Sequence, residues 1–245
     1  MSSTTNALTV PDIVGRLEGL ARFSAAGPGV TRLAYDDAWF DAHRWLVREA
    51  GSLGLAATAD WAGNLFLHDP AVVPGRTDQP VILIGSHLDS VVCGGRYDGA
   101  YGTIAGLLIA AANRGRAGLP VVGFVTCEEE DSRFHGGMMG GRSLLGRVED
   151  AELDAIADRD GVTWRQALAT ARARGCAAAP GPGGTAATPL FRPALQLELH
   201  IEQGPVLEAQ HLGIGIVERI AGYRRWIARI EGESRHSGTT PMAMR

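Results

Sequence analysis

Three short apolar runs constrain this sequence most, because each is followed at once by residues that can bind a metal ion. The runs are VILIG (81–85), VVGFVTC (121–127) and ALQLEL (194–199). Each has the length and composition of a buried β strand. Between the first two lies GTIAGLLIAAANRG (102–115), apolar all round and long enough for a buried helix. This order predicts a doubly wound α/β fold, with a mostly parallel sheet and helices on both faces.

Two amphipathic helices are expected before the first of these strands. Residues 10–23 place four apolar side chains on one helical face: Ile13, Val14, Leu17 and Leu20. Asp36 or Asp37 can cap a second helix that runs to Gly51. Its inward-facing residues are expected to be Trp39, Leu46, Val47 and Ala50.

The remaining segments give weaker signals. NLFLH (64–68) reads as a short strand, and residues 141–175 read as mostly helical. Residues 177–189 have the composition of a loop. From residue 212 the sequence alternates in the manner of antiparallel strands, as in YRRWIARIEG (223–232). We therefore expect one domain over residues 1–215 and the start of another over 216–245.

Composition excludes several classes of protein. With 45% hydrophobic residues, 20% charged residues and a net charge of -4, the chain resembles an ordinary globular protein. It shows no basic stripe that would attract nucleic acid or an anionic membrane. Its three cysteines, Cys93, Cys127 and Cys176, do not indicate a disulfide framework. We find neither a signal-peptide pattern nor an apolar run of about 20 residues, so a cytoplasmic location is expected.

Ligand-type residues stand at the exit of each predicted strand. The first strand leads to Ser86-His87-Leu88-Asp89, the second to the glutamates at 128–130, and the third to His200. In open α/β sheets, sites form outside the carboxyl ends of the strands. The sequence therefore predicts that His87, Asp98, one of these glutamates and His200 meet in one site.

The chemistry of this set indicates a divalent metal. Mixed nitrogen and oxygen ligands suit Zn²⁺, Mn²⁺ or Co²⁺ rather than Ca²⁺ or an iron–sulfur cluster. Asp89, two residues after His87, is expected to accept the other imidazole N–H and so orient the ring. Glycines are expected to let the loop that carries Asp98 fold tightly over the strand end; they are Gly94, Gly95, Gly99 and Gly102.

Consecutive glutamates can divide the work of such a site. One can bind metal while its neighbour acts as general base on a water. Taken singly, each residue has a structural alternative: His87 as a core histidine, Asp98 as a turn residue, and the glutamates as a solvated face. Their convergence at three strand ends favours the metal site. The other histidines considered are expected to be structural: His43, His68, His135 and His211.

Four longer motifs resemble a known family. They are GSHLDSVVCGGRYDGAYG (85–102), EEEDSRF (128–134), LELHIEQGPVLE (197–208) and GESRHSGTTPM (232–242). They resemble the M20 metallopeptidase-like amidohydrolases, and most of all the hydantoinase/carbamoylase branch. That branch contains allantoate amidohydrolases, N-carbamoyl-L-amino-acid hydrolases and β-ureidopropionases. The resemblance runs from about residue 80 to the end of the chain and implies a zinc-exopeptidase-like catalytic domain.

The resemblance also implies roles for individual residues. His87 and His200 would bind one metal, Asp98 would bridge two metals, and Glu130 would bind the second. Glu129 would be the general base, although a shift of the pair to Glu128 and Glu129 is an alternative. Gln203 and His236 would contact substrate, with His236 stabilising the oxyanion. The family binds two Zn²⁺ or Mn²⁺ ions per site.

A reaction follows from the resemblance. A water activated by the metal ions attacks the carbonyl of a ureido or carbamoyl group, and Glu129 carries its proton to the leaving nitrogen. The carbamate then breaks down to CO₂ and ammonia. The expected partners are this small substrate and a second copy of the chain, since the family forms homodimers.

One departure from the family matters for these expectations. Members of the branch continue through an α+β lid and dimerisation domain, of which residues 216–245 would be the first hairpin, to a further metal-binding histidine. We therefore expect this chain to be truncated, to hold at most one metal well, and to be weak as a catalyst. The alternatives are an M20 aminoacylase or peptidase, or an impaired remnant that binds only a metal or a partner.

Overall fold

The computed structural model describes residues 10–76, 78–179, 189–222, 224, 226, 228 and 231–244. The chain divides into two compact units, Met1–Ile201 and Glu202–Arg245. The boundary expected between residues 215 and 216 stays a prediction. The alternating segment 223–232 and the loop at 177–189 lie largely outside the described residues.

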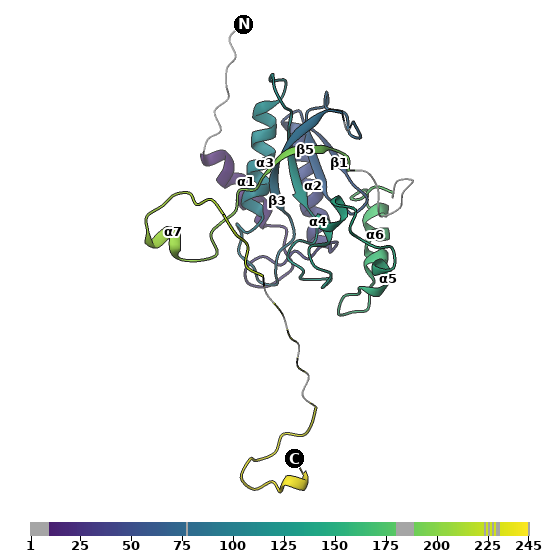
Figure 1. Cartoon of the computed structure of the whole chain (residues 1–245), viewed down its shortest axis with the longest axis vertical. Coiled ribbons are helices and arrows are strands. Elements are labelled where there is room, and N and C mark those ends of the chain that lie inside the picture. The colour runs from purple at the N-terminus through teal and green to yellow at the C-terminus, as the bar shows by residue number, and fades with distance from the viewer. Residues whose placement is uncertain are drawn as a thin grey trace. The chain divides into compact units, whose positions relative to one another are not determined.

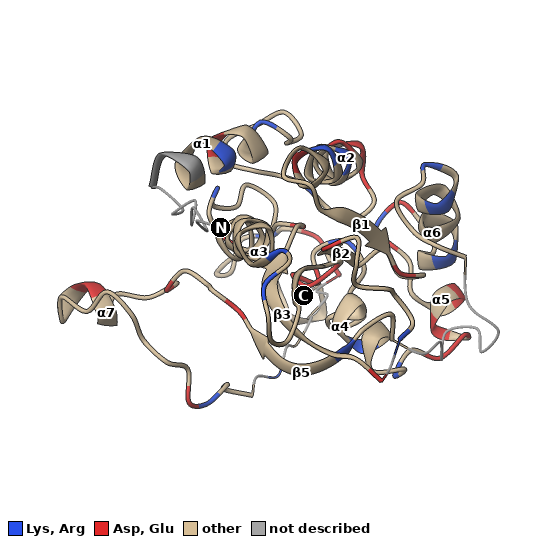
Figure 2. Cartoon of the chain, turned by 90° about the horizontal axis from the view of Figure 1, so that it is seen from above, with Lys and Arg blue, Asp and Glu red and all other residues tan. Residues whose placement is uncertain are grey.

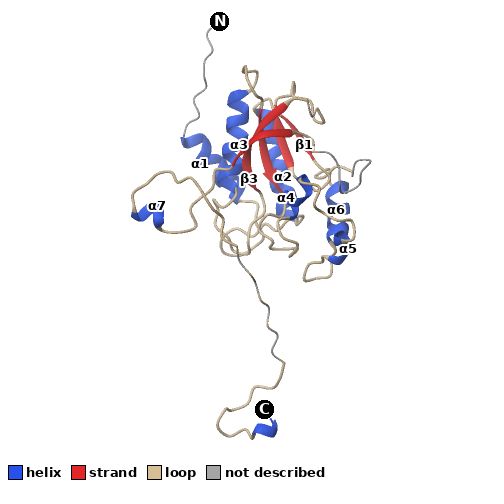
Figure 3. Ribbon diagram, viewed as in Figure 1, coloured by secondary structure: helices blue, strands red, loops and turns tan. Residues whose placement is uncertain are grey.

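The first unit is built on a single five-stranded sheet among its described residues (Figures 1 and 3). The strands are β1 (Ala56–Ala59), β2 (Leu65–His68), β3 (Pro80–His87), β4 (Val121–Thr126) and β5 (Arg192–Leu197), in the order β1-β2-β4-β3-β5. β3 runs parallel to β4 and to β5, whereas β1, β2 and β4 pair antiparallel. The sheet is therefore mixed, with its three parallel strands at one side.

Helices flank the sheet on both faces, as the fold prediction requires. α1 (Val10–Ala21), α2 (Asp37–Ser52) and α3 (Ala100–Asn113) lie on one side, and α4 (Met139–Leu144) lies on the other (Figure 2). α5 (Glu152–Ala155) and α6 (Trp164–Ala173) follow. None of the helices in the described ranges is both long enough and apolar enough to cross a membrane.

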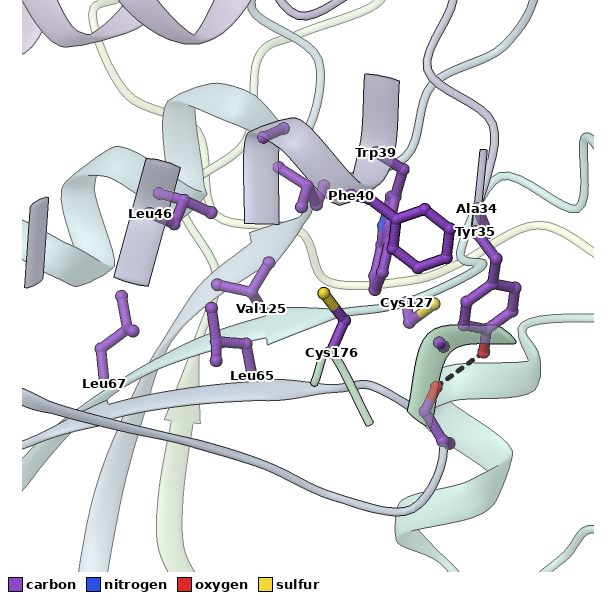
Figure 4. Close-up of a cluster of buried hydrophobic side chains, with 14 of the residues drawn as sticks. Ala34, Tyr35, Trp39, Phe40, Leu46, Leu65, Leu67, Val125, Cys127 and Cys176 are labelled. Atoms are coloured by element: carbon purple, nitrogen blue, oxygen red, sulfur yellow. Dashed lines mark hydrogen bonds between the residues drawn. The ribbon is translucent and has the colours of Figure 1, made fainter. Parts of the chain in front are cut away.

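Two hydrophobic clusters result from the alternation of side chains along the strands. Leu65 and Leu67 of β2 enter the larger cluster, which they share with α1, α2 and α3. Phe66 points the other way and packs in the smaller cluster with Phe124 and Phe191. Figure 4 shows part of the larger cluster, in which the buried Tyr35 hydroxyl donates to the Ala62 carbonyl at 2.6 Å.

The structure corrects two expectations about the fold and adds one strand. Val47 is exposed on α2, where Phe40, Ala42 and His43 are buried in addition to the other three residues expected. β1, a run of small residues, was not predicted. The third apolar run contributes its first four residues, 194–197, to β5, but β5 is an edge strand among the described strands and its six residues are all exposed.

The second unit contains little regular structure in its described part. α7 (Val206–Ala209) begins where the Glu202 carboxylate accepts the backbone N–H groups of Val206 and Leu207. A single turn of 3-10 helix covers Met242–Met244.

Candidate metal centre

The parallel strands deliver ligand-type side chains to one edge of the sheet. β3 ends at His87, which pairs with Thr126, the last residue of β4. β5 runs parallel to β3 on its other side and ends three residues before His200. The exits of all three strands thus lie side by side, as expected for the carboxyl ends of parallel strands.

Three predicted ligands converge at this edge. One candidate ligand atom from each of His87, Asp98 and His200 lies within 4.8 Å of the other two. The Nε2 atom of His200 is 3.1 Å from Oδ1 of Asp98, and the Nε2 atom of His87 is 3.6 Å from the same oxygen. The His87 side chain is 2% exposed and the His200 side chain 35% exposed, so the group extends from the interior to solvent.

Glycine allows Asp98 to reach this position. Gly99 adopts a φ of 63°, and a Cβ atom there would lie 2.4 Å from the His87 ring. A Cβ at Gly102 would lie 2.3 Å from the Leu199 carbonyl oxygen, so this glycine lets α3 approach the segment that leads to His200. The expectation of tight packing applies to these two glycines, whereas Gly95 has open space around it.

The orientation of His87 comes from the backbone of Asp89. The Asp89 carbonyl can only accept, so the Nδ1 atom of His87 at 2.9 Å must carry the proton. When its ring is neutral, His87 therefore presents an unprotonated Nε2 atom toward Asp98, the form that binds a metal. The Thr103 hydroxyl of α3 donates to the His87 carbonyl at 2.9 Å and fixes the strand end.

The carboxylate of Asp89 has a different role from the one predicted. We expected it to accept the imidazole N–H, but it accepts the backbone N–H groups of Glu129 at 3.2 Å and Glu130 at 3.0 Å. The difference arises because the chain turns at Glu128, which has a φ of 51°, and the next two amides then lie within reach of Asp89. This carboxylate therefore holds the acidic turn rather than the histidine ring.

The three consecutive glutamates have distinct environments. Glu128 is fully buried, and its Oε1 atom accepts backbone N–H groups further along the turn. Glu129 lies with Oε2 3.7 Å from the Nε2 atom of His87, and its side chain is 34% exposed. Oε1 of Glu130 is buried and has no hydrogen-bond partner among the described residues.

The electrostatics of the site favour a cation. Burial alone would lower the pKa of His87, but Asp98, Asp89 and Glu129 outweigh it and raise the pKa to about 9. Burial raises the pKa of Glu129, with a further contribution from Asp89, and it also raises the pKa of Glu130. Burial and the charge of Asp89 raise the pKa of Glu128 to about 8. Excess negative charge in a desolvated site is what a divalent ion would neutralise.

The donor set also fits such an ion. Two imidazole nitrogens and a carboxylate oxygen are the usual protein ligands of Zn²⁺ in a site with an open position. The buried Oε1 atom of Glu130 is a further acceptor, for which the described residues supply no donor. The described residues could therefore hold a metal through His87, Asp98 and His200.

Comparison with known proteins shows what the chain resembles. The sequence is 39% identical over 229 residues to an N-carbamoyl-L-amino-acid amidohydrolase of Paenarthrobacter aurescens, and 35% identical over 239 residues to an allantoate amidohydrolase of Bacillus subtilis. A crystal structure of a hydantoinase/carbamoylase family amidase from Burkholderia ambifaria matches with a TM-score of 0.69 and 29% identity. Over almost its whole length the chain is thus similar to amidohydrolases of N-carbamoyl-L-amino acids and allantoate, and to a hydantoinase/carbamoylase family amidase.

These matches cover nearly all of this chain but only about half of each matched protein. They cover 92%, 95% and 95% of this chain, but 54%, 55% and 55% of the three proteins. The chain thus spans about half the length of the curated relatives it matches. No protein-family model matches it.

Two residues to which the family resemblance gives a role in substrate binding lie in the second unit. The Nδ1 atom of His236 accepts the backbone N–H groups of Gly238 and Thr239, each at 3.2 Å, within a local turn. Gln203 is exposed next to Glu202. Their roles toward the substrate of a hydantoinase/carbamoylase amidase stay predictions.

Sequence reasoning missed one buried cation close to the site. The guanidinium of Arg32 donates to the carbonyls of Leu88, Leu20 and Phe23, and Arg32 is 2% exposed. Burial lowers its pKa to about 10, while the nearby Asp89 opposes that shift. Its segment, GVTRLAY (29–35), has no recognisable motif, because the role of Arg32 depends on carbonyl groups from distant parts of the chain.

The histidines expected to be structural stand apart from the metal-type group. His43 is buried against Trp39, with ring centroids 5.2 Å apart, and burial lowers its pKa to about 4. His68 lies within hydrogen-bonding distance of the Thr58 hydroxyl and the Asp69 carbonyl. Within the described residues, the group that could bind a metal contains only His87, Asp98 and His200.

Proposed function

We propose that this chain forms the metal-binding part of an amidohydrolase that cleaves a linear C–N bond in a ureido or carbamoyl group. The substrate class is allantoate or an N-carbamoyl-L-amino acid, as the names of the relatives suggest. The observation that supports the proposal best is the convergence of His87, Asp98 and His200 beside Glu129.

The metal would be held by His87, Asp98 and His200, with Zn²⁺ or Mn²⁺ as the candidates. When bound, such an ion lowers the pKa of a water and polarises a carbonyl oxygen. In a two-metal arrangement Asp98 would be shared, and Glu130 would belong to the second ion. Because the described residues bring together three ligands for one ion only, we propose that this chain binds one ion well.

Glu129 would act as the general base. Its carboxylate faces His87 and is partly open to solvent, so it can reach both a water and a substrate. It would take a proton from the attacking water and deliver it to the leaving nitrogen, after which the carbamate breaks down to CO₂ and ammonia. Gln203 and His236 would contact the substrate, and His236 would stabilise the oxyanion.

Two further expectations belong to this proposal. The family resemblance implies a homodimer, and we propose that the whole protein forms one. The expected cytoplasmic location fits a small soluble substrate of this kind.

The test is ammonia release from allantoate and from N-carbamoyl-L-amino acids, measured with added Zn²⁺ or Mn²⁺. We expect metal-dependent release that is abolished by Glu129→Gln while the metal content stays the same. Glu18→Gln, at an exposed position on α1, is the matched control and should leave turnover unchanged. Release that survives Glu129→Gln, or cleavage only of N-acyl amino acids or peptides, would contradict the proposal.

A further inference from the structure

The turn after β4 is closed by a buried carboxylate that the proposed reaction does not use. Glu128 is 0% exposed and has a φ of 51°, in the left-handed region. Its Oε1 atom accepts the backbone N–H of Arg133 at 3.2 Å and that of Phe134 at 2.8 Å. A solvated acidic run, which was the structural alternative for these glutamates, would not bury a carboxylate in this way.

The far end of this turn is anchored in the protein interior. Phe134 is 0% exposed and packs near Tyr35, with ring centroids 6.2 Å apart. The Arg133 guanidinium donates to Asp158 at 3.0 Å and to the Ala34 carbonyl at 2.7 Å. The bonds from Glu128 therefore tie the end of β4 to a fixed point in the core.

The near side of the same turn is held by Asp89. Its two carboxylate oxygens accept the backbone N–H groups of Glu129 and Glu130. The acidic pair, Glu129 and Glu130, thus lies between two buried carboxylates. Together these carboxylates accept hydrogen bonds from four backbone amides of the turn. With both ends fixed, the pair has few backbone conformations available to it.

We propose that Glu128 is a positioning residue for the acidic pair. By accepting the amides of Arg133 and Phe134 it closes the turn, and the closed turn directs the side chains of Glu129 and Glu130 toward the metal ligands. The inference rests on the proposed function, because it assigns Glu128 a role toward the metal and the general base of that same site.

Two substitutions separate the reach of Glu128 from its charge. Glu128→Gln keeps an oxygen at the same distance from the backbone but cannot carry a negative charge at any pH. Glu128→Asp keeps the charge but shortens the side chain by one methylene, so the oxygen no longer reaches the two amides. If position is what matters, Gln should preserve the turn and Asp should open it.

The first readout is metal affinity, measured by chelator competition. We expect Glu128→Asp to weaken Zn²⁺ binding by about tenfold to a hundredfold, the usual effect of losing a residue that orients ligands, and Glu128→Gln to stay within about threefold. Leu168→Ala, at a fully buried position on α6, controls for general loss of stability and should leave the affinity unchanged. The opposite pattern, with Asp neutral and Gln impaired, would overturn the proposal in favour of a purely electrostatic role.

The second readout is hydrogen–deuterium exchange in the metal-free protein over residues 128–134. We expect faster exchange of this peptide in Glu128→Asp, unchanged exchange in Glu128→Gln, and no local change in Leu168→Ala. Equal exchange in all three variants would overturn the proposal. If the wild-type chain binds no metal, the proposed function fails, while the exchange data still decide whether Glu128 closes the turn.

Discussion

Two buried polar groups adjoin the carboxyl end of β4, and they differ in how their hydrogen bonds are satisfied. In one, Asp60 and Asn64 are joined side chain to side chain, and Asn64 also donates to the Gly140 carbonyl and the Ser143 hydroxyl. The Oδ1 atom of Asn64 accepts the N–H of Cys127, the residue that follows β4. In the other, His87, Asp98 and His200 converge with few donors and much negative charge.

The difference indicates what each group is for. Each side-chain oxygen and nitrogen of Asp60 and Asn64 has a partner in the protein, so this network can only stabilise the turn and strand it joins. Beside the histidine-containing group, a buried carboxylate oxygen of Glu130 has no partner in the part of the chain that the structure describes. A buried polar group that the protein leaves unsatisfied favours an external partner, and here the chemistry favours a divalent cation.

The largest expected effect comes from a substitution that breaks the hydrogen-bond network of Asp60 and Asn64. Asn64→Ala leaves the Cys127 N–H and one oxygen of the buried Asp60 without partners, so we expect the free energy of unfolding to fall by about 3 kcal/mol. Denaturant-induced unfolding measures this loss. Affinity for Zn²⁺ should change by less than about threefold in the folded variant, and a larger loss of affinity than of stability would show that the two groups are not separate.

A pair of glycine substitutions tests the second group, the one that contains His87. Gly99 and Gly115 have φ values of 63° and 67°, but a Cβ at Gly115 would meet nothing within 4 Å. Both substitutions to alanine therefore carry a similar backbone cost of about 1 kcal/mol. Only Gly99→Ala displaces the His87 ring, so we expect it to weaken Zn²⁺ binding by about a hundredfold in a chelator competition assay. Equal affinities in the two variants would refute the steric argument.

The smallest expected effect is a pH dependence of the unfolding free energy, caused by Asp60. Burial raises the pKa of Asp60 to about 6, against 3.8 for the free side chain. Because the folded pKa is raised, protonation stabilises the fold below pH 3.8, and this stability is lost as the pH rises through 6. Relative to Asp60→Asn, the wild-type protein should gain about 1 kcal/mol in unfolding free energy between pH 7 and pH 5. A flat difference across this range would contradict the assignment.

Much of the fold could be predicted, because its signals are local. The cap at Asp36, the apolar periodicity of α1 and the runs that form β3 and β4 are properties of short segments. The exposure of β5 was not predictable in the same way, since it depends on which elements cover the two faces of the strand. Leu195 and Leu197 suggest a buried strand whether or not another element covers them.

The candidate site was predictable only where it depends on the order of the strands. The topology of parallel strands brings His87 and His200 to one edge, and this follows from sequence order alone. The bonds of Asp89 did not follow, because they depend on the path of the backbone after β4. Arg32 was missed for the same reason, as its partners are carbonyl groups, which carry no sequence signal.

The most direct test of the account is metal binding by the purified, metal-free chain. Isothermal titration with Zn²⁺ should give one equivalent per chain. Asp98→Asn should weaken that binding by at least about a hundredfold, because it removes the negative charge that both histidines face and replaces one carboxylate oxygen with an NH₂ group. Asp60→Asn, the matched change in the satisfied network, should leave the affinity unchanged. Absence of Zn²⁺ binding, or equal affinity in Asp98→Asn and the wild-type chain, would contradict the claim that this group is a metal centre.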